Sequence, residues 1–400
     1  MLDTGHRRVK RSLRRLSVVG LVLALVLPTS ASSREVISSS KNFEQIGSIT
    51  IPGVVVSGAL AGDTFFASSW QSGLYSYDVS DPTDPKLLDQ VGDDQLLMQE
   101  LENEEMVTNG KILLLSRFFD TPTSVLYVID VSDPKNMKIE ATLDGAGAHT
   151  YTCLYDCKWA YGTVNGLDNR GIILDLHDPS NPKLLDKPWT DAINGTYVHD
   201  VTEVRPGLVL TSSSPMFALD TTDPTKPRAI MKTDAGSTNI SHNNIWPRSG
   251  KDRFLITASE AVNNGRCETY GDEGKTLQVW RTDGWRTKGF KPVGSYTLVN
   301  GTGSDGQPPL DVFGIQGCSA HWAREHPSFH NGGLVAMAAY SHGVRLLDIS
   351  PKGTPREVGY FLKDIQAAID VTWLTDRIMY VVEDGSGGAI DIVKYTGPLP

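Results

Sequence analysis

The sequence predicts an all-β fold, a seven-bladed β-propeller with four antiparallel strands in each blade. The phrase Leu74-Tyr-Ser-Tyr-Asp78-Val-Ser-Asp-Pro82 recurs along the chain with small changes. Its aspartates Asp78, Asp130, Asp175 and Asp220 follow one another at steps of 52, 45 and 45 residues, the period of a propeller blade and longer than a solenoid turn needs. Runs of β-branched and aromatic residues between turn-forming residues can also be grouped into seven such units.

The individual strands follow from these runs. The innermost strands are expected to begin near Val54, Glu102, His149, His199, His242, His321 and Ile369. The second strands are expected to begin near Thr64, Lys111, Lys158, Gly207, Arg253, Gly333 and Arg377, and the third strands carry the repeated Asp phrase. Fourth strands follow in runs such as Lys86 to Val91 and Arg356 to Leu362.

The seventh blade has no fourth strand of its own before Pro400. The run from Phe43 to Ile51 resembles the other fourth strands, and it precedes the first blade. We therefore expect it to complete blade seven, which closes the ring and removes the open sheet edges.

An Asp-Pro pair follows most of the third strands. The Asp side chain can accept hydrogen bonds from the backbone of its own turn, and Pro cannot donate to a strand ladder. The pair therefore predicts a strand end. A calcium site is disfavoured because these turns lack the dense acidic pattern of a calcium loop.

Residues 1–31 are expected to form a secretory signal peptide. Six Arg and Lys residues precede an apolar run from Leu16 to Leu27, and small residues follow up to Ala31. The run is too short to cross a bilayer of about 30 Å as a helix, so no transmembrane anchor is expected after cleavage. The protein would then be secreted, extracellular or held at the cell envelope, with a flexible linker at 32–42 and a single propeller domain at 43–400.

The composition excludes several classes of function. Removal of residues 1–31, which hold six Lys or Arg and one Asp, changes the formal net charge from −10 to −15. A chain this acidic is not expected to bind nucleic acid. The sequence also has no Walker loop, no G-x-S-x-G elbow and no dinucleotide fingerprint, which argues against nucleotide-binding and hydrolase functions.

Four cysteines in an exported chain indicate two disulfides. Cys153 and Cys157 can close a tight hairpin, which leaves Cys267 and Cys318 to join a long insertion to the next blade. The alternative is half of a metal site, but no second thiol pair has a matching spacing.

The repeated strands resemble a known family at this point. Aliphatic strands that end in Ile-Asp-Val-Ser-Asp-Pro, as at Ile129 to Pro134, are similar to the LVIVD-repeat β-propellers of bacterial surface and secreted proteins. The resemblance covers nearly all of residues 43–395. It implies the fold and an external location, and it implies no particular chemistry.

The inner strands carry the most informative pattern. When they are aligned on the hairpins that follow them, one column contains His149, His199, His242 and His321 in four consecutive blades, with Glu102 one blade earlier. Inner strands line a narrow channel, so these side chains should meet there. Imidazoles placed together can share a transition metal such as Cu or Zn, whose identity the ligands do not fix. The alternative is a water-filled channel without an ion.

The ends of the second strands should form the mouth of this channel. A small-molecule ligand could bind where charged and aromatic side chains converge over the histidines. The residues expected at this mouth are Trp70, Arg117, Ser213, Glu260, His342 and Glu383. A solvated rim is the alternative for each.

Three functions remain open. The first is a secreted propeller that binds a metal or a small ligand without turnover. The second is a metal-dependent oxidoreductase, because the histidine column and His199-Asp200 are similar to the selenium-binding-protein and methanethiol-oxidase propellers, a resemblance that implies copper. In that case Glu260 or His342 would transfer protons as general acid or base. The third is a protein-interaction scaffold whose channel is inert.

Overall fold

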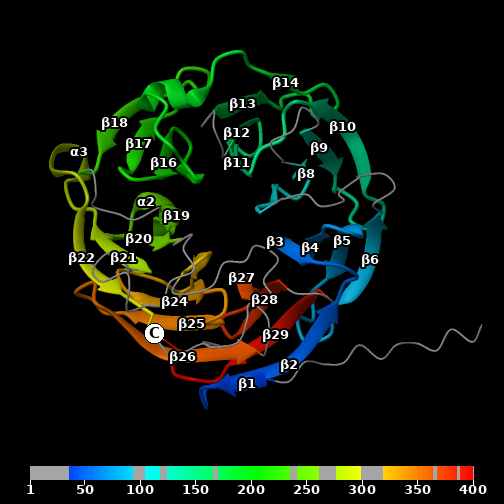
Figure 1. The fold of residues 1–400 in the computed structure, drawn as a ribbon, viewed down its shortest axis with the longest axis vertical. Coiled ribbons are helices and arrows are strands. Elements are labelled where there is room, and N and C mark those ends of the chain that lie inside the picture. Colours follow the sequence, from blue (N-terminus) through cyan, green and yellow to red (C-terminus); the bar gives the residue numbers. More distant parts are fainter. Residues whose placement is uncertain are drawn as a thin grey trace, which may run out of the picture. The chain divides into compact units, whose positions relative to one another are not determined.

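Seven antiparallel sheets surround a central axis in this protein, as Figure 1 shows. The computed structural model describes residues 36–92, 104–117, 124–164, 170–234, 241–260, 276–298, 319–363, 367–384 and 388–399. The seven-bladed β-propeller predicted from the repeats is confirmed. No helix within these ranges is long and apolar enough to cross a membrane.

Each blade runs from an inner strand at the axis to an outer strand at the rim (Figure 1). Blades one to three comprise β3 (Val55–Ala61), β4 (Thr64–Ser69), β5 (Gly73–Asp78) and β6 (Lys86–Val91); β7 (Val107–Thr108), β8 (Ile112–Arg117), β9 (Val125–Asp130) and β10 (Lys138–Asp144); and β11 (Thr150–Leu154), β12 (Trp159–Thr163), β13 (Gly171–Asp175) and β14 (Lys183–Leu184).

Blades four to six continue the same order. They comprise β15 (Asp200–Arg205), β16 (Leu208–Ser212), β17 (Phe217–Asp220) and β18 (Arg228–Lys232); β19 (Ser241–Ile245), β20 (Phe254–Ser259), β21 (Leu277–Arg281) and β22 (Lys291–Tyr296); and β23 (Ala323–Glu325), β24 (Gly333–Ala338), β25 (Val344–Ile349) and β26 (Pro355–Lys363). Short helical turns η1 (Trp189–Ile193), α2 (Pro247–Gly250) and α3 (Trp285–Lys288) lie in the connections.

Blade seven is closed by the N-terminal strand, as predicted. It contains β27 (Ala367–Trp373), β28 (Ile378–Asp384) and β29 (Ala389–Tyr395), and its outer strand is β2 (Phe43–Thr50). In Figure 1 the blue β2 lies beside the red β29. Ile49 faces Ile390 across this pair, and both side chains are buried in one hydrophobic cluster. Burial of this strand therefore joins the two ends of the ring by packing as well as by hydrogen bonds.

The segment before β2 differs from the prediction. The sequence predicts a flexible linker at 32–42, but residues 36–39 form the strand β1 (Val36–Ser39), which pairs with β26 and gives blade six a fifth strand. The amide of Asn42 also donates a hydrogen bond to the carbonyl of Val358 at 2.8 Å. The reason is the outer edge of β26, whose backbone groups offer β1 hydrogen-bond partners.

The Asp-Pro turns behave as expected. The aspartates of the four pairs, Asp81, Asp133, Asp178 and Asp223, each accept a hydrogen bond from the backbone N–H two residues later, at 3.0 to 3.2 Å. The aspartates that end the third strands three residues earlier, Asp78, Asp130, Asp175 and Asp220, do the same at 2.9 to 3.1 Å. Hydrogen bonds from the hydroxyl and the N–H of Thr222 lower the pKa of Asp220 to about 2. These local bonds end the third strands at the predicted positions.

The hydrophobic cores lie between neighbouring blades. The third strands are buried on both faces, as in β9, whereas the outer strands alternate between exposed and half-buried residues, as in β10. One cluster joins Ile112 of blade two to Ala160 and Leu174 of blade three. Packing of this kind fixes the inner strands around the axis and so determines which side chains meet in the channel.

Candidate metal centre in the central channel

Four histidines stand at equivalent places at the axis. These residues are almost fully buried, with exposures of 6% for His149, 2% for His199, 0% for His242 and 4% for His321. The backbone N–H groups of His149, His199 and His321 donate to backbone carbonyls at the ends of the second strands, at 2.8, 2.9 and 2.9 Å. The same backbone hydrogen bond therefore places three of the four residues. We call these four side chains the histidine cluster.

The structure brings the histidine cluster together from blades three to six. Going round the axis, the ring centroids of successive histidines are 4.7, 3.8 and 4.1 Å apart. The Nε2 atoms of His149 and His199 are 3.0 Å apart. These distances are short enough for the rings to share one ion.

A carboxylate from blade two lies among the four rings. Oε1 of Glu104 is 2.7 Å from Nε2 of His242 and also contacts Nε2 of His321. Oε2 is 3.2 Å from Nε2 of His199 and also contacts Nε2 of His149. Although burial opposes ionisation, the four imidazoles hold the pKa of Glu104 well below its ordinary value.

Glu104 takes the position that the sequence analysis gave to Glu102, which lies outside the described residues. The strand pairing explains the shift. Glu104 precedes the start of β8 at Ile112 by eight residues, whereas His149 precedes the start of β12 at Trp159 by ten. The first hairpin of blade two is therefore shorter than that of blade three. The sequence contained the right residue two positions further along the same acidic segment, which runs from Glu102 to Glu105.

Backbone carbonyls fix the tautomers of two histidines. Nδ1 of His199 donates to the carbonyl of His242 at 3.1 Å, and Nδ1 of His321 donates to the carbonyl of Ile369 at 2.5 Å. Because a carbonyl can only accept, both Nδ1 atoms carry hydrogen, and a neutral ring then directs the lone pair of Nε2 into the cluster. Metal-binding histidines are commonly oriented in this way. Nδ1 of His242 has no hydrogen-bond partner among the described residues.

The neighbours of each ring set its charge. Burial, together with the adjacent His199 and His321, holds the pKa of His242 well below its usual value, so this ring is neutral. Burial also disfavours the charged form of His321, but the Glu104 carboxylate outweighs it and raises the pKa of His321. In the absence of a metal, His321 therefore tends to hold a proton between itself and Glu104.

A second carboxylate stands beside the cluster. Glu260, which follows β20, is 8% exposed and accepts a hydrogen bond from the hydroxyl of Tyr340 at 2.6 Å. Its other oxygen is 4.0 Å from Nε2 of His199. Two groups of three residues could each hold a metal ion, because the three donor atoms within a group lie within 4.8 Å of one another. His242 belongs to both groups. The two groups are Glu104, His199, His242 and His242, Glu260, His321.

The other residues expected at the channel mouth have varied surroundings. Trp70 is buried against Val54 and Val56, and Arg117 is half-buried at the end of β8. Ser213 donates to the carbonyl of Pro215 at 2.7 Å.

His342 and Glu383 are both buried. The carbonyl of His342 accepts a hydrogen bond from Arg345 at 2.9 Å. Glu383 lies 4.0 Å from Nζ of Lys363. An acid or base role for His342 or Glu260 stays a prediction.

Cys153 and Cys157 form the expected disulfide across the hairpin that joins β11 and β12. Cys267 and Cys318 lie outside the described residues, so their pairing stays a prediction.

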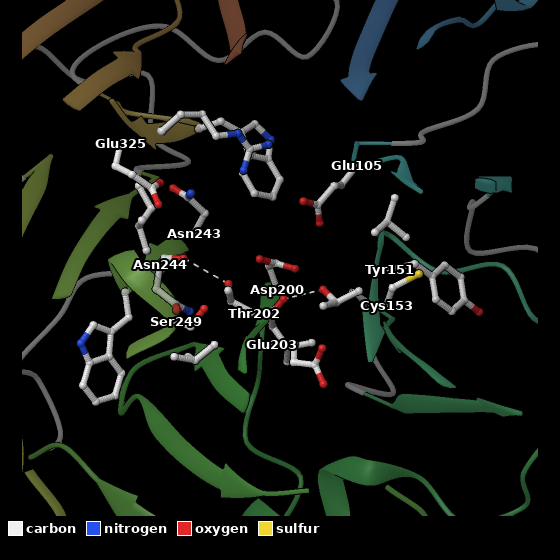
Figure 2. Close-up of a pocket in the computed structure, with 18 of the residues that line it drawn as sticks. Glu105, Tyr151, Cys153, Asp200, Thr202, Glu203, Asn243, Asn244, Ser249 and Glu325 are labelled. Atoms are coloured by element: carbon white, nitrogen blue, oxygen red, sulfur yellow. Dashed lines mark hydrogen bonds between the residues drawn. The ribbon is translucent and has the colours of Figure 1, made fainter. Parts of the chain in front are cut away.

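A cavity of about 380 Å³ occupies the other end of the channel, towards the ends of the inner strands. Figure 2 shows Glu105 and Asp200 pointing towards the middle of this space. Burial raises the pKa of Asp200 to about 6, and burial and the charge of Asp200 raise the pKa of Glu105 well above its usual value. No repeated motif marks the inner-strand ends that line this cavity, so the sequence did not predict it.

Comparison with known proteins adds support for the fold. No family model and no curated protein matches the chain. Among solved structures, it is similar to the β-propeller domain of Cps50 (Swd1) from Myceliophteria thermophila, with a TM-score of 0.54 and 12% identity over 86% of this chain and 99% of that chain. Identity this low supports a shared fold alone.

Proposed function

We propose that this propeller binds one divalent transition-metal ion in its channel through the histidine cluster and Glu104. The observation that carries the proposal is the convergence of four buried imidazoles, two of them with Nδ1 held by backbone carbonyls, on a single carboxylate. A buried group of this kind needs either shared protons or a cation to satisfy the facing nitrogen lone pairs.

The charges and donor types fit a divalent ion. Glu104 and Glu260 supply two negative charges when ionised, and neutral imidazoles add none. The donors are nitrogen and oxygen with no thiolate in either set. Such a set suits Zn²⁺, Cu²⁺, Ni²⁺ or Fe²⁺ better than Ca²⁺ or Mg²⁺, which prefer oxygen donors. We expect the ion to take its ligands from the histidine cluster and Glu104, with Glu260 as a further ligand or as a hydrogen-bond acceptor beside it.

The direct test is metal analysis of the purified protein. The chain would be stripped with chelator, loaded separately with Zn²⁺, Cu²⁺, Ni²⁺ and Fe²⁺, desalted and measured by plasma mass spectrometry. One equivalent of at least one of these ions should remain bound. The double variant His199→Ala, His242→Ala should lose it.

His177→Ala is the matched control. His177 lies in an exposed Asp-Pro turn with a side-chain exposure of 55%, and the variant should keep the full metal content. Glu104→Gln, a change of similar shape, provides a second test if the double variant folds poorly, and it should weaken binding without removing any histidine. The proposal would be refuted if the double variant and Glu104→Gln both bound as much metal as wild type. It would also be refuted if the folded wild type bound none of the four ions.

We also propose that the protein is exported. The Arg-rich start and the apolar run of residues 1–31 support this, and the Cys153–Cys157 disulfide is typical of an oxidising compartment. Residues 1–35 lie outside the described part of the chain. N-terminal sequencing of the protein from its native culture should give a start near Ser32, and an intact Met1 in that material would contradict export by cleavage.

A further inference from the structure

The cavity at the inner-strand ends is separate from the histidine cluster and has its own polar lining. Residues of β11, β15, β19 and β23 and of the connection after β19 surround it. Asp200 and Asn243 lie deep, with exposures of only 2% each. Arg248 and Ser249, which also line the cavity, are exposed to solvent. The cavity is therefore open at one end of the channel and polar at its base, and its volume falls in the range of small-molecule sites.

Several buried polar atoms around this space lack a protein partner. Oε2 of Glu105, Oδ1 of Asp200 and Oδ1 of Asn244 are buried acceptors with no hydrogen-bond partner among the described residues. Nε1 of Trp322 is a buried donor that also has no hydrogen-bond partner among the described residues. Leaving a buried polar group without a hydrogen-bond partner destabilises the fold, so four such groups around one cavity indicate a ligand or ordered water that satisfies them.

Acidic side chains outnumber basic ones in the lining of the cavity. Four carboxylates line the cavity, against two guanidinium groups. The carboxylates belong to Glu105, Asp200, Glu203 and Glu325, and the guanidiniums to Arg248 and Arg324. Arg324 is not available to an anion in the cavity, because it lies 3.5 Å from Asp370 and stacks over the ring of Trp322 at 4.7 Å.

An inorganic ion does not fit the same lining. Among the described residues, the sets of three possible metal ligands within 4.8 Å of one another combine the histidine cluster with Glu104 or Glu260, and the cavity carboxylates form no such set. A charge carried by several N–H groups can reach acceptors that are further apart. A primary ammonium group has three N–H donors, which equals the number of unpartnered acceptors around the cavity.

We propose that this cavity binds a small organic cation with a primary ammonium group, held by Asp200 and Glu105. Asn244 accepts a further hydrogen bond, and the indole N–H of Trp322 donates to a hydroxyl or carbonyl of the same ligand. The site does not depend on a metal in the histidine cluster, so it can be tested in chelator-treated protein.

The probe is ethanolamine, and its neutral control is ethylene glycol, which has nearly the same shape and no charge. Binding would be followed by titration calorimetry, or by ligand-observed NMR if it is weak, near neutral pH in chelator. Ethanolamine should bind saturably with a millimolar or lower Kd, and ethylene glycol should not bind. Asp200→Asn and Glu105→Gln keep the side-chain shapes and should each weaken ethanolamine binding at least tenfold.

Asp133→Asn is the matched control, because Asp133 is exposed in an Asp-Pro turn away from the cavity, and this variant should bind as wild type does. Circular dichroism would verify that each variant folds. Glu105 is only half-buried, so Glu105→Gln provides the test if Asp200→Asn misfolds. Absence of saturable binding to the folded wild type, equal binding of ethylene glycol, or undiminished binding to both cavity variants would overturn the proposal.

Discussion

The carboxylate at the centre of the histidine cluster gives the sharpest stability prediction. Glu104→Gln removes one charge and keeps the shape of the side chain. The Glu104 side chain is only 9% exposed and contacts all four imidazoles. Breaking a buried ion pair by removing one partner costs about 3–5 kcal/mol. Because Gln retains one oxygen acceptor, we expect the metal-free variant to lose about 3 kcal/mol of unfolding free energy, the lower end of that range.

The loss should depend on pH in a defined direction. The lowered pKa of Glu104 gives stability that is present above the unfolded carboxyl pKa of about 4.3 and is lost as pH falls through the folded value. The raised pKa of His321 gives stability that is complete below the unfolded imidazole pKa of about 6.5 and is lost as pH rises through the folded value. The cost of Glu104→Gln should therefore be largest between these limits, at about pH 5.5, and smaller at about pH 9.

Urea unfolding of both proteins in chelator, at the two pH values, measures this cost. His242 acts in the same direction, because Glu104 opposes the lowering of its pKa and the variant loses that support, which weakens the variant further in acid. A variant as stable as wild type at the lower pH, or one whose loss grows towards the higher pH, would show that Glu104 does not hold a charged His321.

Three further predictions follow. Metal affinity should rise about tenfold per pH unit while the pH lies below the raised pKa of His321, because the metal must displace the proton of this ring. Calorimetry in buffers of different ionisation enthalpy would detect the released proton. Ile49→Ala in the closing strand should cost about 2–5 kcal/mol in urea unfolding, whereas Thr50→Ala at the next, exposed position should cost little. Removal of the Cys153–Cys157 disulfide, whose cysteines are 4 residues apart, should cost only about 2 kcal/mol because the loop is short, and a fully unfolded Cys153→Ala, Cys157→Ala variant would contradict this.

Much of the fold could be read from the sequence because each blade repeats the same local chemistry. Asp78, Asp130, Asp175 and Asp220 end their strands through bonds to their own turns, so their positions carry over directly to the structure. The closing strand was equally visible, since its apolar residues match those of the other outer strands. β1 was not, because its pairing depends on the free edge of β26, which only the assembled sheet presents.

The candidate site could be predicted wherever the hairpin after the inner strand could be aligned with those of the other blades. The four histidines precede hairpins that could be aligned, and the structure brings their rings together. The acidic member was displaced by two residues because the hairpin of blade two is short. The cavity near Asp200 could not be foreseen, since its lining comes from inner-strand ends that share no motif and converge only around the closed ring.

Anomalous X-ray diffraction from crystals loaded with the metal that binds stoichiometrically would locate the ion in the channel. We expect one strong anomalous peak on the axis, at about 2.0–2.2 Å from Nε2 atoms of at least three members of the histidine cluster. A well-ordered channel in which the four rings surround only Glu104 and water, with the anomalous signal elsewhere on the molecule, would contradict this expectation.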